Sequence, residues 1–147
     1  MAKFVYRMQS ILDIKLKLEK QAKIAYSIAN NKLQEEQMKL HDILARRAKY
    51  ENEARELVSG VIHVEKLQEN KHAIDVLKSR QREQMMNVHV AEKNVEAARK
   101  HLNEVMTERK THERLKEKAF ENFKQELQYM ENKEIDELVS YSFHEGE

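Results

Sequence analysis

The stretch Leu57-Val58-Ser59-Gly60-Val61-Ile62-His63-Val64 decides the fold of this chain. It contains the only interior glycine in a sequence of 147 residues that has no proline. The β-branched residues after Gly60 favour a helix less than unbranched residues do, because their side chains lose rotamer freedom in a helix. We therefore predict that the chain reverses direction here, through a turn at about residues 59–63.

Apolar residues recur with heptad spacing on both sides of this turn. A one-residue skip near Lys32 divides the N-terminal pattern, and such a skip perturbs a supercoil without ending the helix. Before the skip the pattern consists of Ile11, Ile14, Leu18, Ala25 and Ile28, and after it of Leu33, Leu40, Ile43, Tyr50, Ala54 and Leu57. The C-terminal arm supplies Leu67, Ile74, Leu77, Val88, Ala91, Val95, Ala98, Leu102 and Val105.

The two patterns fit one antiparallel register. It pairs Leu57 with Leu67, Tyr50 with Ile74 and Leu33 with Ala91, and beyond the skip Ile28 with Val95, Leu18 with Val105 and Phe4 with Ala119. Some layers contain Arg47, Asn70, Gln81 or Gln84, and buried polar residues of this kind select a register at some cost in stability. A parallel homodimer of one continuous helix is the alternative arrangement.

The fold class predicted is all-α: a two-helix antiparallel coiled-coil hairpin with an overhanging C-terminal helix. A single domain spans residues 1–147, with helices at about 4–58 and 64–139 and a tail at 140–147. The register exhausts the first arm near Ala119, and an apolar stripe continues beyond it without an internal partner. Exposed helical stripes of this kind typically mark an interaction surface. The stripe consists of Phe120, Phe123, Leu127, Met130, Ile135 and Leu138.

Composition argues against catalysis and against nucleic-acid binding. Charged residues make up 36% of the chain but nearly cancel to a net charge of +1, and aromatic residues are only 6%, whereas nucleic-acid binders are usually basic. The absence of cysteine excludes a disulfide framework or a zinc ribbon. The sequence has one Glu-x-x-His motif, Glu69 to His72, whereas a di-iron bundle needs two such motifs and two further Glu on facing helices. We expect no enzyme activity, no cofactor and no metal site.

Two stretches resemble the flagellar export protein FliJ family. They are the opening Phe4-x-Tyr6-Arg7-Met8-Gln9-x-Ile11-Leu12-Asp13-Ile14-Lys15 and the closing Asn132-Lys133-Glu134-Ile135-Asp136-Glu137. The resemblance implies a stalk-like coiled coil that binds the hexameric flagellar export ATPase FliI and the export-gate protein FlhA and couples them, with export chaperones as further partners. It also implies a cytoplasmic protein, peripheral at the cytoplasmic face of the inner membrane through its partners only. The absence of a signal sequence or an apolar span agrees with that expectation.

The resemblance assigns two sets of contact residues. Analogy with the stalk of rotary ATPases assigns the ATPase contact to Phe4, Tyr6, Arg7, Ile11, Phe123, Leu127, Met130, Ile135 and Leu138. The export-gate contact falls on apolar residues outside the seam in the middle of the hairpin: Met38, Leu44, Val76, Met85, Met86 and Val90.

Three other functions share this architecture. The first is the related stalk protein of a virulence-type injectisome. The second is a chaperone with prefoldin-like hairpins, although those usually join through β-hairpins for which this turn leaves little room. The third is a passive spacer, which would need no apolar overhang.

Overall fold

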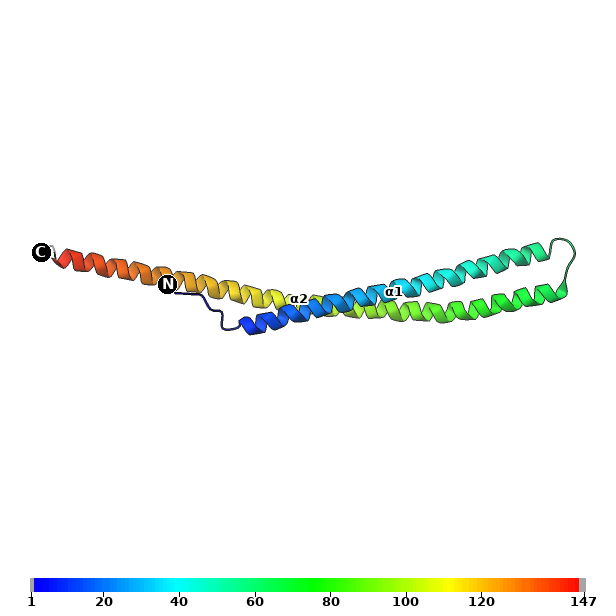
Figure 1. Ribbon diagram of the computed structural model, residues 1–147, viewed down its shortest axis with the longest axis horizontal. Helices are drawn as coiled ribbons and strands as arrows, with labels where there is room; N and C mark the ends of the chain where they lie inside the picture. The colour runs from blue at the N-terminus through cyan, green and yellow to red at the C-terminus, as the bar shows by residue number, and fades with distance from the viewer. Residues whose placement is uncertain (1, 146–147) are drawn as a thin grey trace. The chain divides into compact units, whose positions relative to one another are not determined.

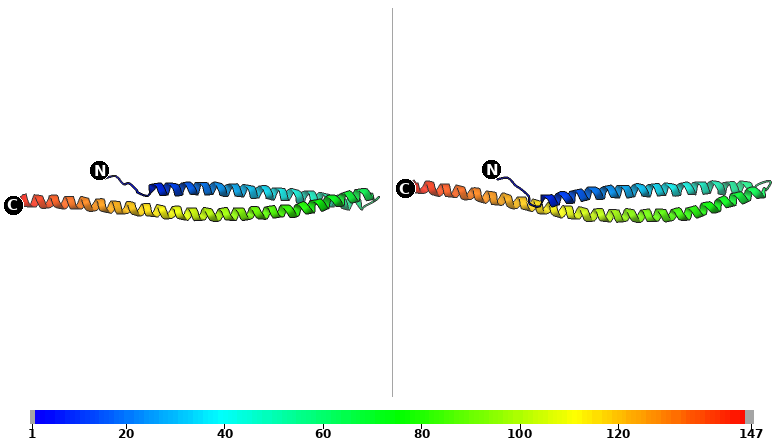
Figure 2. Two further views of the ribbon diagram at one scale, coloured as in Figure 1. Left: turned by 90° about the horizontal axis from the view of Figure 1, so that it is seen from below. Right: turned by 60° about the horizontal axis from the view of Figure 1, so that its bottom comes forward.

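The computed structural model describes residues 2–145, which form two helices and no strand. Helix α1 spans Gln9–Leu57 and helix α2 spans Val64–Glu145. The chain divides into a turn unit, Ala22–Leu102, and a terminal unit, which combines Met1–Gln21 with Asn103–Glu147. Within the turn unit the two helices run side by side from the connecting turn (Figures 1 and 2). The predicted all-α helical hairpin is confirmed.

The turn between the helices has the backbone that its glycine allows. Helix α1 ends at Leu57, and Ser59 closes it by donating both its backbone N–H and its hydroxyl to the carbonyl of Glu56, at 3.2 and 2.9 Å. Gly60 then adopts a φ of 109°, a region that residues with a Cβ rarely enter. The carbonyl of His63 accepts the first helical hydrogen bond of α2, from the N–H of Leu67.

At the turn the helices end close to the predicted residues, but their outer ends differ from the prediction. Helix α1 begins at Gln9 rather than near residue 4, and its first turn contains no acidic residue. Lys3 and Arg7 precede it, and positive charges at a helix N-terminus oppose the macrodipole, so extension toward residue 4 is disfavoured. Helix α2 continues to Glu145 rather than 139, because the sequence offers no glycine or proline before Gly146.

The seam on α2 is as predicted. All nine residues assigned to it are buried or half-buried, and Leu77, Ala91 and Val105 are the most enclosed, at 4–6% exposure. On α1 the predicted residues after the skip, from Leu33 to Leu57, are also half-buried. The fold therefore rests on one narrow apolar seam between two helices.

The first half of the α1 seam was predicted wrongly except for Ile11, which is half-buried. Ile14 and Ile28 are 55% and 63% exposed, Leu18 is 39% exposed, and Ala25 is exposed as well. The enclosed positions are instead Leu12, Glu19, Ala22, Tyr26, Ala29 and Leu33, which continue the spacing of the later seam without a skip. The more apolar heptad thus faces solvent, and a less apolar one that contains Glu19 faces α2. This heptad faces α2 because it continues the later seam without a skip and because its polar residue Glu19 is bound by Arg109 of α2.

Those polar groups include three contacts between the helices in the turn unit. The Gln84 amide donates to the carboxylate and to the backbone carbonyl of Glu36, at 2.5 and 2.8 Å. Asn70 donates to the carbonyl of Tyr50 at 2.9 Å, and Arg47 donates to the side-chain oxygen of Gln81 at 2.7 Å. Glu36, Asn70 and Gln84 are each at most 7% exposed, so a shift of register would leave buried polar atoms without partners.

The terminal unit has an equivalent contact between Glu19 and Arg109. The guanidinium binds both carboxylate oxygens of Glu19, at 2.7 and 3.1 Å, and also donates to Glu113 at 2.9 Å. These hydrogen bonds, led by the one to Glu19, raise the pKa of Arg109. Lys15 pairs with Glu108 at 2.8 Å in the same unit. A bidentate arginine contact is directional, so it constrains the register as well as compensating the charge of a buried carboxylate.

Two leucines of α1 distinguish the observed seam from the predicted one. Leu12 is 4% exposed and Leu18 is 39% exposed. We expect Leu12→Ala to lower the free energy of unfolding by about 2 kcal/mol or more, because it leaves a cavity in the seam. Leu18→Ala should cost less than about 1 kcal/mol. Urea unfolding followed by circular dichroism measures both variants. A larger loss of stability in Leu18→Ala than in Leu12→Ala would favour the predicted seam with a skip.

Glu36 should make the stability of the chain depend on pH. Hydrogen bonds from Gln84 and then Lys32 lower its pKa below the ordinary 4.5. The unfolded chain therefore binds this proton at a higher pH than the folded chain does, and the stabilising contribution is lost as the pH falls through the folded pKa. The stability of the wild type relative to Glu36→Gln should be constant near neutral pH and should fall below about pH 4.5. Glu35→Gln is the control, because Glu35 is exposed. If the stability of the wild type relative to Glu35→Gln fell over the same pH range, the pH dependence could not be assigned to Glu36.

Candidate protein-binding surfaces

The segment before α1 packs against α2 through aromatic rings. In the terminal unit the ring of Phe4 lies 5.0 Å from that of Phe120 and 5.4 Å from that of Phe123, between ring centres. The register prediction paired Phe4 with Ala119, one residue away from this contact. It also left Phe123 without an internal partner, which is wrong, because Phe123 is half-buried against Phe4.

Four of the predicted ATPase-binding residues surround one hollow beside this aromatic cluster. Phe4, Tyr6 and Arg7 line it from the N-terminal segment, and Phe123 lines it from α2 together with Ala119. Ile11 is half-buried at the start of α1, where it contributes little exposed surface. The structure therefore brings the N-terminal segment and residues 119–126 of α2 together at this hollow.

The other predicted ATPase-binding residues lie farther along α2. Leu127 is half-buried, and from Gln128 to His144 every residue is exposed. Met130, Ile135 and Leu138 are 56–66% exposed, as expected for a stripe that lacks an internal partner. The prediction that the helix ends near residue 139 missed the last members of this surface, and the lack of glycine or proline before Gly146 was the signal that could have found them. These last members are Tyr141 and Phe143, and Tyr129 and Val139, which lie within the predicted helix, are exposed apolar residues as well.

Acidic residues alternate with this apolar stripe. Glu131, Glu134, Asp136 and Glu137 occupy the same stretch of α2, against the single base Lys133. Because α2 continues to Glu145, these carboxylates lie outside its last turn and the macrodipole has little influence on them. Both the apolar stripe and its charges are therefore suited to a partner with apolar and basic groups.

The predicted export-gate residues are all exposed in the turn unit, but they form more than one patch. Met85 and Met86 line a hollow with Leu40, Val88 and His89. Met38 lines a different hollow on α1, beside Gln34, Gln37, His41 and Asp42. Leu44, Val76 and Val90 are 37–54% exposed and line neither hollow.

Neither a metal site nor a membrane span is found in the part of the chain that the structure describes. Within residues 2–145, no three His, Asp or Glu side chains are grouped so as to hold a metal ion. Neither α1 nor α2 contains, over its described residues, a stretch long and apolar enough to cross a bilayer.

Comparison with known families decides the identity of this hairpin. The family described as flagellar FliJ protein matches residues 4–147. The chain belongs to the FliJ family. Membership associates it with protein export by a type III apparatus, and no enzymatic family is indicated. No curated relative matches this FliJ-family chain significantly.

A solved structure shares the fold. It is CT670 from Chlamydia trachomatis, proposed to be a YscO homolog, which is 22% identical to this chain. The similarity covers 99% of each chain with a TM-score of 0.58. At this level of identity the likeness concerns the hairpin fold alone.

Phe4 should hold the N-terminal segment on α2. Replacing it by Ala removes both ring contacts, and aromatic pairs contribute about 0.5–1.5 kcal/mol each beyond their buried area. We expect Phe4→Ala to accelerate hydrogen exchange at the first amides of α1 and to expose Phe123, with little change in total helicity. Val5→Ala is the matched control, since Val5 is 75% exposed. Unchanged exchange in Phe4→Ala would show that the segment is held by other contacts.

Proposed function

We propose that this FliJ-family chain is a non-enzymatic component of flagellar type III export that binds the hexameric export ATPase FliI through its terminal unit. The observation that carries the proposal is the apolar stripe of α2 beyond Leu127, which remains exposed although it is regularly spaced. A chain that functioned alone would gain no stability from Met130, Ile135 and Leu138 in water. Burial against a partner would contribute roughly 1.5–3 kcal/mol for each of them.

The charges beside the apolar stripe also support the ATPase as its partner. The four carboxylates between Glu131 and Glu137 would face basic groups at the opening of a ring, while the apolar stripe enters it. The hollow bordered by Tyr6, Arg7 and Phe123 lies in the same unit, so the N-terminal segment can contribute to the same contact. These features support an ATPase contact formed by both ends of the sequence.

The second partner that we propose is the export-gate protein FlhA, bound by the middle of the turn unit. Met85 and Met86 border the most suitable hollow, and methionine side chains adapt to irregular apolar partners because they are flexible and polarisable. A chain that binds the ATPase with one unit and the gate with the other would couple the two. It would lie at the cytoplasmic face of the inner membrane through these partners, and export chaperones would use the same exposed apolar residues.

Replacing Met130, Ile135 and Leu138 together by Gln tests the ATPase contact. Because all three are exposed, helicity and the urea midpoint should be nearly unchanged. Affinity for the purified ATPase should fall by about a hundredfold or more, and stimulation of ATP hydrolysis should fall with it. Binding titrations, ATPase assays and circular dichroism on one preparation measure all three quantities.

The matched control replaces Met38, Met86 and Val90 by Gln, which changes equally exposed apolar residues of the turn unit. This variant should keep its affinity for the ATPase and lose affinity for the export gate. Full ATPase stimulation by the Met130, Ile135 and Leu138 variant would refute the proposed contact. Loss of its fold would show that these residues are part of a core in a homodimer.

A further inference from the structure

Four apolar residues are exposed around the turn between α1 and α2. They are Val58, Val61, Ile62 and Val64, with 58%, 82%, 55% and 63% of their surface exposed. We call this group the turn tip. Turns are usually built from Gly, Asn, Asp, Ser and Pro, so four β-branched aliphatic residues within seven positions are unusual. A contiguous exposed apolar group marks an interaction site more often than scattered exposed residues do.

The hairpin does not need the turn tip for its own packing. Leu57 and Leu67 are half-buried and close the seam before the turn is reached. A Cβ added to Gly60 would meet no atom within 4 Å, so Gly60 itself does not pack against the helices. More than half of the surface of each residue of the turn tip therefore remains in contact with water in the free chain.

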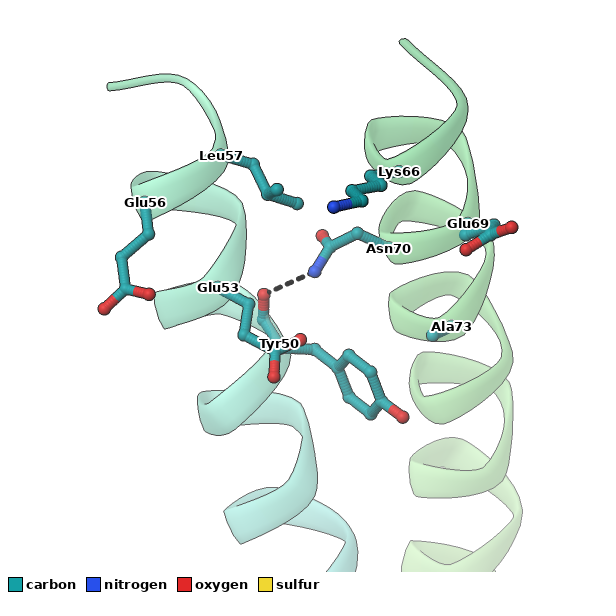
Figure 3. Close-up of a pocket in the computed structure, with 8 residues that line it drawn as sticks. All are labelled: Tyr50, Glu53, Glu56, Leu57, Lys66, Glu69, Asn70 and Ala73. Atoms are coloured by element: carbon teal, nitrogen blue, oxygen red, sulfur yellow. Dashed lines mark hydrogen bonds between the residues drawn. The ribbon is translucent and has the colours of Figure 1, made fainter. Parts of the chain in front are cut away.

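A hollow between the helices lies directly below the turn (Figure 3). Tyr50 and Leu57 line it from α1, and Lys66, Asn70 and Ala73 line it from α2. Figure 3 shows Leu57 and Lys66 directed toward the space between the helices and Asn70 bound to the carbonyl of Tyr50, while Glu56 and Glu69 point outward. The hydrogen bond of Asn70 holds the two helices together at this level.

Acidic residues outnumber lysine and arginine in the sequence on either side of the turn tip. Between Glu53 and Glu69 the sequence has the acids Glu53, Glu56, Glu65 and Glu69 against two bases, Arg55 and Lys66. Negative charge of this kind repels anionic lipid headgroups and nucleic-acid phosphates. Residues 58–64 include His63 but contain no Trp, Tyr, Phe, Lys or Arg, the residues with which loops commonly enter a membrane interface. A second copy would present the same carboxylates, so two tips would repel each other.

We propose that the turn tip inserts into an apolar socket of a protein partner whose rim carries lysine or arginine side chains. The apolar residues supply the buried contact, and the surrounding carboxylates pair with the rim. This surface is distinct from the ATPase and export-gate contacts proposed above and does not depend on either of them.

Photo-crosslinking in cells that carry the full-length chain tests the proposal. A benzoylphenylalanine at Val61 should yield one protein adduct, and the same group at the exposed Ser79 should not. Peptide mapping should place the crosslink among apolar residues next to Lys or Arg. An adduct to a second copy of this chain, to lipid alone, or to a site without basic neighbours would overturn the proposal, as would the absence of an adduct.

Binding assays with the purified partner then measure the contributions of the apolar and the acidic residues. Ile62→Ser with Val61→Ser should weaken binding by at least about tenfold. Glu53→Lys with Glu69→Lys should also weaken it and should abolish its decrease with added salt. Ile24→Ser is the control, because Ile24 is 53% exposed in the same unit but lies outside the turn tip. Equal loss in Ile24→Ser, or binding of the wild type to phosphatidylcholine–phosphatidylglycerol vesicles, would contradict a protein socket. All of these variants should still bind the ATPase, so the result is independent of the proposed function.

Discussion

The whole structure depends on one narrow seam in which each helix has a single neighbour to pack against. Each layer of such a seam buries little apolar surface, and the most enclosed residues include Ala22 and Ala91 as well as Leu12 and Leu77. Because apolar burial is modest, the register must be specified by groups that tolerate no displacement. Glu36 with Gln84, and Glu19 with Arg109, are groups of this kind. Moving either helix by one residue would strand a buried carboxylate, which costs far more than an imperfect apolar contact.

The same constraint leaves much of the apolar surface outside the seam. Ile14 and Ile28 on α1, the stripe beyond Leu127 on α2 and the turn tip all remain exposed. In a compact globule such residues would be covered by further elements. In a two-helix hairpin they are available to other proteins, and this agrees with a family associated with type III export rather than with catalysis.

The exposed surfaces differ in charge and therefore suit different partners. The stripe in the terminal unit alternates with carboxylates along a helix, whereas the hollow around Met85 and Met86 also includes Arg82 and Glu92. The turn tip is aliphatic and bordered by carboxylates. Distinct surfaces on one scaffold would suit the separate partners proposed above.

The sequence by itself determined that two helices form and where they reverse. Heptad spacing, the absence of proline and the single interior glycine at Gly60 are local properties, and a helix responds to local properties. The seam of α2, from Leu67 to Val105, also followed from its pattern, because that arm has one clearly apolar heptad. The apolar stripe from Met130 to Leu138 could be read in the same way. The contacts of these surfaces with the proposed partners were inferred from family resemblance and remain predictions.

Only the tertiary structure decided which face of α1 meets α2. Two heptads compete on the first part of this helix, and hydrophobicity alone favours the one with Ile14 and Ile28, which is exposed. The other heptad faces α2 because Glu19 meets Arg109, 90 positions away in the sequence, and Glu36 meets Gln84, 48 positions away. The rings of Phe4 and Phe123 meet in a similar way across the length of the chain. The free energy of such pairs exists only once both helices are in place, so no pattern within α1 could reveal it.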